Sequence, residues 1–135
     1  PRKKIFLLDE SMGGKLAAEA LRQAGYETTH VKDHFAPGTA DEIWLARAGK
    51  DRWIVVTRDR KLRKRPNEVA AIFEHRVFAV VIAAHGATGQ EVAEQLRLHA
   101  NRIVELASTE KPPAIYTLTK RGGPQRYEIR KRPRK

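Results

Sequence analysis

Short runs of apolar and β-branched residues recur along the chain, separated by segments whose apolar positions repeat every three or four residues. Runs of this kind are typical of strands that are covered on both faces of a sheet. They predict strands at residues 5–8, 27–31, 53–57 and 77–83. Two further strands flank Gly122-Gly123 as a predicted hairpin, at residues 115–119 and 126–130.

The segments between these strands have apolar residues at every third or fourth position, which predicts helices. Residues that can cap or open a helix mark four starts, at Ser11, the Thr39–Glu42 capping box, Pro66 and the Thr88–Glu91 capping box. The second helix is expected to end near Gly49, and the last is expected to be long and to reach Ala107. Alternating strands and helices favour a mainly parallel sheet with helices on both faces. The expected fold is therefore α/β, a three-layer α/β/α sandwich with a C-terminal β-hairpin and a basic tail.

The length of 135 residues predicts one main domain. We expect it to span residues 1–110, followed by a hairpin extension at 111–131 and the tail at 132–135. No apolar run approaches the roughly 20 residues needed to span a bilayer. The absence of cysteine excludes disulfides, thiolate zinc sites and cysteine nucleophiles. It also fits a reducing cytoplasm, where we expect the protein to act.

The charge is strongly basic and unevenly distributed. The net charge is +11, of which residues 120–135 contribute +7, and a second concentration places six basic residues among the eight at 58–65. Such clusters attract phosphate backbones through counterion release. A purely solubilising role remains an alternative for the tail. The 58–65 cluster favours phosphate binding because it surrounds Asp59.

Acidic residues stand where predicted strands and helices meet. Asp9 directly follows the first strand, Asp59 comes two residues after the third, and Asp41 and Glu42 open the helix between the second and third. Because functional crevices of parallel sheets lie at the carboxyl ends of the strands, we expect these carboxylates to converge. A divalent cation would relieve their repulsion, and hard oxygen ligands suit Mg²⁺ or Mn²⁺. Thr57 could hydrogen-bond a carboxylate there.

Each acid also has a structural interpretation. Asp41 or Glu42 could merely cap a helix and complement its dipole, and Asp59 could cap the turn entered at Arg60. Asp9 is harder to explain in this way, since folding does not require an acid after four apolar residues. Asp33, just past the second strand, is a weaker candidate ligand. Trp44 and Trp53 are expected in the core.

Four segments carry a family resemblance in their order along the chain: Leu7–Met12, Ala20–Glu27, Thr39–Leu45 and Trp53–Asp59. Together they resemble the PIN-like nucleases, and especially the subgroup related to VapC toxins of type II toxin–antitoxin systems. The resemblance covers roughly residues 4–107. It implies an α/β sandwich with an acidic site that binds Mg²⁺ or Mn²⁺ and, in many members, cleaves RNA.

By this resemblance the metal-binding and catalytic residues are Asp9, Asp59 and an acid of the Asp41-Glu42 pair. PIN domains often have a fourth acid near the next strand, whereas here that strand ends in His85-Gly86. The expected partners are an RNA substrate and a cognate antitoxin protein, with a homodimer left open. The residues expected to hold flanking phosphates are Arg58, Arg60, Lys61, Arg63 and Lys64.

The function expected from these observations is a metal-dependent endoribonuclease, the toxin of a toxin–antitoxin pair. One alternative is a non-catalytic nucleic-acid-binding module on the same scaffold, in which the acids only cap helices. A third interpretation is a hydrolase of small phosphate esters. Magnesium-dependent RNA cleavage separates the first from the second.

Overall fold

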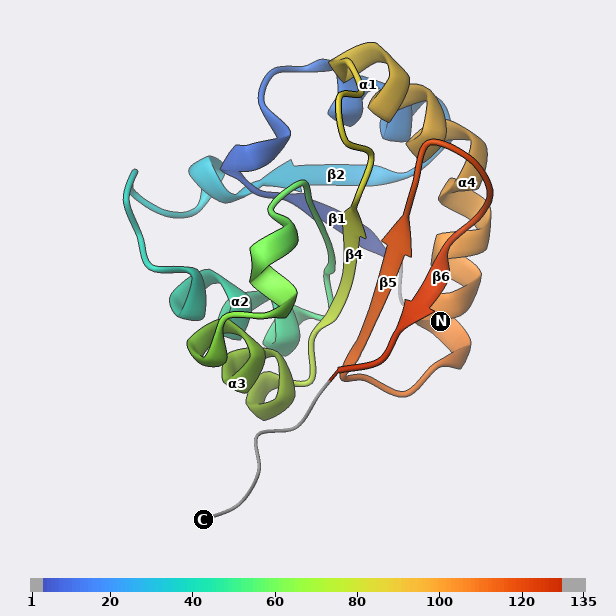
Figure 1. The fold of residues 1–135 in the computed structure, drawn as a ribbon. Coiled ribbons are helices and arrows are strands. Elements are labelled where there is room, and N and C mark those ends of the chain that lie inside the picture. The colour runs from blue at the N-terminus through green and yellow to red at the C-terminus, as the bar shows by residue number, and fades with distance from the viewer. Residues whose placement is uncertain (1–3, 130–135) are drawn as a thin grey trace.

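Buried strands pair into one six-stranded sheet in the computed structural model, which describes residues 4–129 (Figure 1). The strands are β1 (Ile5–Leu8), β2 (Glu27–His30), β3 (Ile54–Thr57), β4 (Phe78–Ile82), β5 (Ala114–Leu118) and β6 (Gln125–Tyr127). Their spatial order is β2-β1-β3-β4-β5-β6, and only the β5–β6 pairing is antiparallel. The predicted hairpin is confirmed, and it continues the main sheet because β5 pairs in parallel with β4. The predicted basic tail lies outside the described residues.

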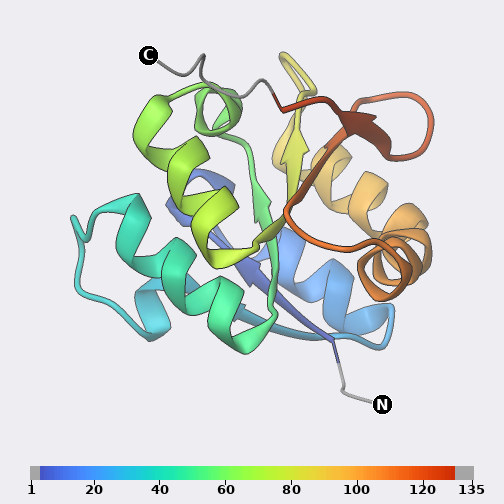
Figure 2. The same ribbon diagram turned by 90° about the horizontal axis from the view of Figure 1, so that it is seen from below.

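Helices cover both faces of the sheet, as Figure 2 shows along the edge of the layers. They are α1 (Leu16–Gln23), α2 (Asp41–Asp51), α3 (Pro66–His75) and α4 (Gly89–Thr109), with three short 3₁₀ helices η1 (Glu10–Met12), η2 (Val31–Asp33) and η3 (Arg60–Arg63). α1 packs against α4 on one face, and α2 packs against α3 on the other. The predicted three-layer α/β/α sandwich is confirmed. Within residues 4–129, no helix combines the length and apolarity needed to cross a membrane.

Alternation along the strands divides the core into two halves. Phe6 and Leu8 of β1 pack with the α1 and α4 layer, whereas Leu7 packs with the α2 and α3 layer. In β3, Val55 likewise points toward α2 and α3. Because side chains alternate between faces, Asp9 and Thr57 are set on the α2 and α3 side at the ends of their strands.

The strand order creates a switch point between β1 and β3. The chain leaves β1 for β2 on one side and returns to β3 on the other, so the two crossovers lie on opposite faces of the sheet. A crevice forms at the carboxyl ends of strands where the order reverses in this way. Asp9 and Asp59 follow the two strands that flank this point.

Three helix boundaries differ from the sequence prediction. Ser11 does not cap a long helix, because it lies in η1 and α1 begins only at Leu16. α2 begins at Asp41 without a side-chain cap, since the Thr39 hydroxyl donates to the carbonyl of Ala36 instead. The capping box of Thr88 with Glu91 is confirmed.

The third difference concerns Gly49, which lies inside α2 rather than at its end. A Cβ at this position would stand 2.0 Å from the backbone oxygen of His75. Gly49 is therefore the point at which α2 approaches the end of α3 most closely, and its lack of a side chain permits that contact.

Candidate active site

Asp9 lies at the carboxyl end of β1 and is only 7% exposed. Its Oδ1 accepts a hydrogen bond of 2.5 Å from the Ser11 hydroxyl, and its Oδ2 accepts one of 2.6 Å from the Thr57 hydroxyl. The two hydroxyls in turn accept backbone N–H bonds from Arg58, at 2.9 Å, and Asp59, at 3.0 Å. This network fixes the Asp9 carboxyl between β1 and β3.

The electrostatic environment of Asp9 disfavours its charged form. Burial raises the pKa of Asp9 above its ordinary value, the hydrogen bonds from Ser11 and Thr57 lower it in part, and repulsion from Asp41 and Asp59 raises it further. Burial also raises the pKa of Asp41, and repulsion from Asp59 adds to that effect. The three acids expected from the sequence therefore lie within electrostatic reach of one another.

Arg65 holds two of these acids together. Its Nη1 donates to Asp59 Oδ2 at 2.9 Å and its Nη2 to Asp59 Oδ1 at 3.2 Å, a bidentate pair. Nη1 also lies 3.9 Å from Asp41 Oδ2 and 3.7 Å from Glu68 Oε2. One guanidinium thus serves as the counter-ion of three carboxylates.

Asp41 is the member of the Asp41-Glu42 pair that faces the cluster. Its Oδ1 accepts a hydrogen bond of 3.0 Å from the indole N–H of Trp44, one turn further along α2. Trp44 is 2% exposed, so the predicted core position is confirmed and the ring also orients the acid. Glu42 makes no hydrogen bond or salt bridge to the residues that the structure describes.

Asp59 caps a turn, as considered for it, and also pairs with Arg65. Its Oδ1 accepts the backbone N–H of Lys61 at 3.1 Å and caps η3, while both of its oxygens bind Arg65. Asp33 is occupied elsewhere, because its Oδ2 accepts the backbone N–H of His30 at 3.1 Å in the η2 cap.

The sequence interpretation missed three residues of the site. Ser11 was assigned to a helix cap, whereas its hydroxyl binds Asp9. Arg65 and Glu68 were overlooked as residues of the site. Both lie at the start of α3, the first α-helix after β3. Glu68 could have been predicted from the sequence, because it is an acid in the first turn of a helix, as Asp41 is.

The donor chemistry of the cluster fits a divalent cation, but its arrangement does not present a formed metal centre. Carboxylate oxygens are the ligands that Mg²⁺ and Mn²⁺ prefer, and the crowding of Asp9, Asp41 and Asp59 favours a cation between them. Among residues 4–129, however, no three acidic or histidine side chains converge closely enough to hold a metal ion. Arg65 supplies the neutralising charge in this arrangement.

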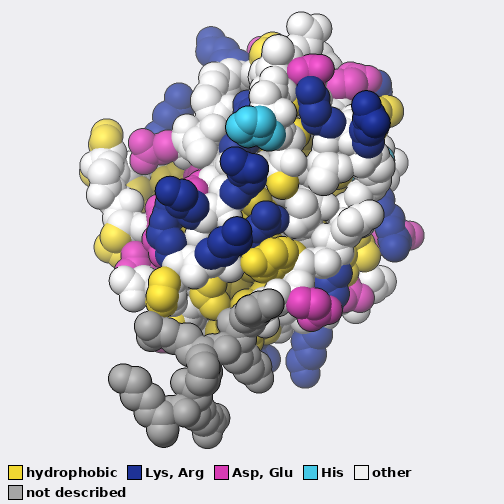
Figure 3. Space-filling view, viewed as in Figure 1, with side chains coloured by type: hydrophobic (Ala, Val, Ile, Leu, Met, Phe, Trp, Pro, Cys, Tyr) yellow, Lys and Arg dark blue, Asp and Glu magenta, His cyan; other side chains and the backbone are white. Residues whose placement is uncertain are grey.

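The basic cluster at residues 58–65 divides into two groups. Arg58 donates to the carbonyl of Ala87 at 2.9 Å, and Arg63 donates to the Thr117 hydroxyl at 2.8 Å while its guanidinium stacks 4.5 Å from the Tyr127 ring. These two residues tie β3 and η3 to the rest of the fold. The exposed members without a salt bridge among the described residues are Arg60, Lys61 and Lys64. Figure 3 shows Lys and Arg side chains gathered on the face over η3 and α3.

Comparison with known proteins identifies the family of the chain. The family model of the PIN-like domain matches residues 4–84, which include β1 through β4 and every residue of the acidic cluster. The chain therefore belongs to the PIN-like domain family, whose members are generally nucleases that use divalent metals. Comparisons with curated proteins and with solved structures returned no match.

Proposed function

We propose that the protein is a metal-dependent endoribonuclease whose active site is built on Asp9, Asp41 and Asp59. The observation that supports this proposal most directly is Asp9, a nearly buried acid held by two hydroxyls and repelled by two other acids. Burial of a charged carboxylate is costly unless a counter-ion compensates it, and groups perturbed in this way cluster at functional sites. Glu42 is the alternative to Asp41 as the third ligand.

In this proposal, different residues bind the metal, position its ligands and bind the RNA phosphates. Asp9, Asp41 and Asp59 would hold Mg²⁺ or Mn²⁺, which supplies Lewis acidity at the phosphate when bound. Ser11 and Thr57 position the Asp9 carboxyl. Trp44 positions Asp41 through its indole N–H. Arg60, Lys61 and Lys64 would bind the phosphates that flank the scissile bond.

Arg65 supports the main rival function, a non-catalytic nucleic-acid-binding module. A guanidinium that pairs with Asp59 and lies near Asp41 and Glu68 gives the cluster an internal counter-ion without a metal. In the catalytic proposal, Arg65 must leave these acids when the metal binds. Its side chain is 40% exposed, so the guanidinium can move into solvent.

Cleavage of single-stranded RNA in Mg²⁺ or Mn²⁺ tests the catalytic proposal, with EDTA as the metal-free reference. Wild-type protein should cleave only with the metal, and Asp9→Asn should not cleave. Metal-independent binding of RNA without any cleavage would favour the rival module. Asp41→Asn and Glu42→Gln, made singly, decide which of the two acids participates.

The RNA path can be tested through the divided basic cluster. The double variant Lys61→Ala/Lys64→Ala should weaken RNA binding. The slope of the logarithm of the binding constant against the logarithm of the salt concentration should fall in magnitude by about one for each lost phosphate contact. Arg63→Ala should instead lower the melting temperature, because its contacts with Thr117 and Tyr127 are internal. Equal salt slopes for wild type and the double lysine variant would place the RNA elsewhere.

The toxin role, with a cognate antitoxin as partner, is a further proposal that rests on the resemblance of the four sequence segments to VapC-related toxins. Induced expression of the wild-type chain should arrest bacterial growth, and Asp9→Asn should not. Growth arrest by both would assign the effect to something other than the acidic site.

A further inference from the structure

A second hollow lies at the opposite edge of the sheet, where the parallel strands begin. It is a cavity of about 480 Å³ between the ends of α2, α3 and α4. Lys4 precedes β1 and Asp9 follows it, so the cavity and the acidic cluster are separated by about five residues of extended chain, or roughly 16 Å. The two sites are therefore distinct.

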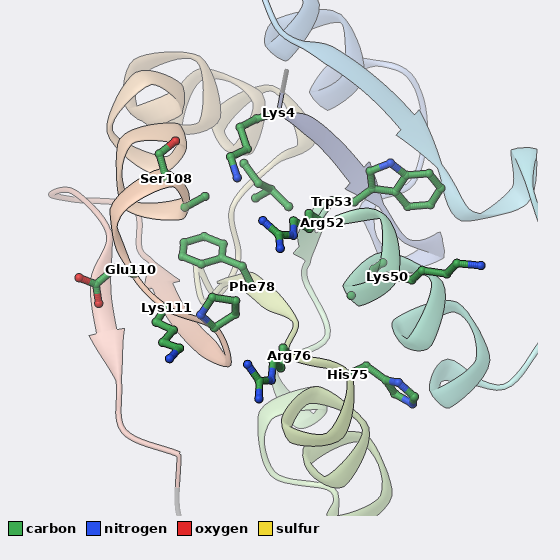
Figure 4. Close-up of a pocket in the computed structure, with 15 residues that line it drawn as sticks. Lys4, Lys50, Arg52, Trp53, His75, Arg76, Phe78, Ser108, Glu110 and Lys111 are labelled. Carbon is green, nitrogen blue, oxygen red and sulfur yellow. The ribbon is translucent and has the colours of Figure 1, made fainter. Parts of the chain in front are cut away.

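The walls of this cavity are strongly basic. Four of its lining residues, shown in Figure 4, are the basic residues Lys4, Arg52, Arg76 and Lys111. Lys50 and His75 also line it, but their side chains point away. Its one acidic residue is Glu110, which is paired with Arg126 at 2.6 Å.

The four cations have no internal counter-ion. Within residues 4–129, no carboxylate lies within 4.0 Å of the charged groups of Lys4, Arg52, Arg76 or Lys111. Like charges held around one hollow repel each other, so a bound anion would stabilise the arrangement.

Two of the four cations stand where an arginine is unfavourable for the backbone. Arg52 and Arg76 follow the ends of α2 and α3 with φ angles of 57° and 54°, the left-handed region that favours glycine or asparagine. They are the two non-glycine residues with positive φ among the described residues, and both line this cavity. Two unfavourable backbone positions that carry arginine at one cavity support a functional role for these guanidinium groups.

The volume and the lining residues of the cavity indicate which class of ligand it could bind. A volume of about 480 Å³ is in the range of small-molecule sites and exceeds what a lone phosphate would fill. Pro112 and the edge of Phe78 add apolar surface to the lining, although Phe78 is only 6% exposed and its ring stacks on Tyr116. A small organic group joined to phosphate groups, with the phosphates beside arginine and lysine, matches this size and charge.

We propose that this cavity binds a nucleoside phosphate, with its phosphates held by Lys4, Arg52, Arg76 and Lys111 and its nucleoside filling the rest of the cavity. A free nucleotide and a nucleotide within an RNA strand share this chemistry. The proposal does not depend on nuclease activity, because the acidic cluster lies at the other edge of the sheet.

Binding measured in EDTA tests the site without cleavage. The probes are ADP, followed by calorimetry, and a fluorescent single-stranded RNA, followed by anisotropy. Arg52→Asn/Arg76→Asn removes two cations and places asparagine where the backbone favours it, so its melting temperature should equal or exceed that of the wild type. Lys15→Gln/Lys32→Gln removes the same charge from exposed positions that do not line the cavity, and it serves as the matched control.

Saturable binding of ADP that falls by about tenfold or more in the arginine variant, but not in the lysine control, would support a free nucleotide as the ligand. If RNA shows this loss of affinity and ADP does not bind, the ligand would be a nucleotide within an RNA strand. Equal affinities of the two variants for both probes would overturn the proposal. A lowered melting temperature of the arginine variant would also count against it, since it would give Arg52 and Arg76 a structural role.

Discussion

An acidic cluster and a basic cavity lie at opposite edges of the sheet, and they differ in how their charge is balanced. At the carboxyl edge, Asp41, Asp59 and Glu68 share the internal counter-ion Arg65. At the amino edge, the cations of the basic cavity have no such partner among the described residues. A cation that enters the acidic site must therefore compete with a side chain of the protein, whereas an anion that enters the basic cavity need not.

The difference shows that residue type alone does not define a binding site. The acidic cluster has an internal counter-ion in Arg65, whereas the cations of the basic cavity have none among the described residues. The acidic cluster leaves Asp9 alone without a cationic partner, and Asp9 is also its most buried acid. The following predictions test the contrast, in order of decreasing effect.

The largest effect is expected at the acidic edge. Asp9→Asn keeps the shape of the side chain but removes the charge that would hold the metal, and RNA cleavage should fall by about 10³-fold. Asp33→Asn, in an exposed acid near the same edge, is the matched control and should cleave at the wild-type rate. Single-turnover cleavage measures both, and wild-type cleavage by Asp9→Asn would remove this acid from the reaction.

The second effect is structural and concerns the wall of the basic cavity. Gly49→Ala would place a Cβ 2.0 Å from the backbone oxygen of His75, and α2 and α3 would have to separate. We expect a loss of about 1–3 kcal/mol in the free energy of unfolding. Gly14→Ala, where a Cβ meets no atom within 4 Å, is the control. Denaturant unfolding with equal midpoints for both variants would contradict the close approach.

The third effect concerns the counter-ion. Arg65→Gln removes the competing charge, so Mn²⁺ should bind about tenfold more tightly, or about 1.4 kcal/mol. Arg60→Gln removes an exposed charge of the same segment without touching the acids and should change Mn²⁺ affinity much less. Calorimetric titration with Mn²⁺ compares them. Weaker binding by Arg65→Gln would show that this guanidinium supports the metal site instead of competing with it.

The smallest effect is the pH dependence of stability at Asp9. Because the pKa of Asp9 is raised in the folded protein, its protonated form stabilises the fold at low pH, and this contribution is lost as the pH rises through the folded pKa. Asp9→Asn should therefore be more stable than wild type at neutral pH, by on the order of 1 kcal/mol. The difference should shrink as the pH falls below that pKa. Melting curves at several pH values in EDTA measure it, and a constant difference would contradict the assigned shift.

The order of strands and helices was accessible from the sequence because it depends on local periodicity. The apolar run of β4 and the capping box of α4 were recognised correctly for this reason. The positions of Asp9 and Asp59 at strand ends followed from the same pattern. Helix starts were less accessible, since Ser11 and Thr39 have the right residue type for a cap but direct their hydroxyls to other partners.

The sequence by itself determined the layered α/β fold and the edge of the sheet at which Asp9, Asp59 and the Asp41-Glu42 pair were expected. Only the tertiary structure decided that Asp41 rather than Glu42 faces the cluster, that Arg65 neutralises it, and that four distant cations surround one cavity. Periodicity specifies which residues are buried and where a strand ends. The direction of a polar side chain depends on which helix packs beside it, and that partner comes from a remote part of the chain.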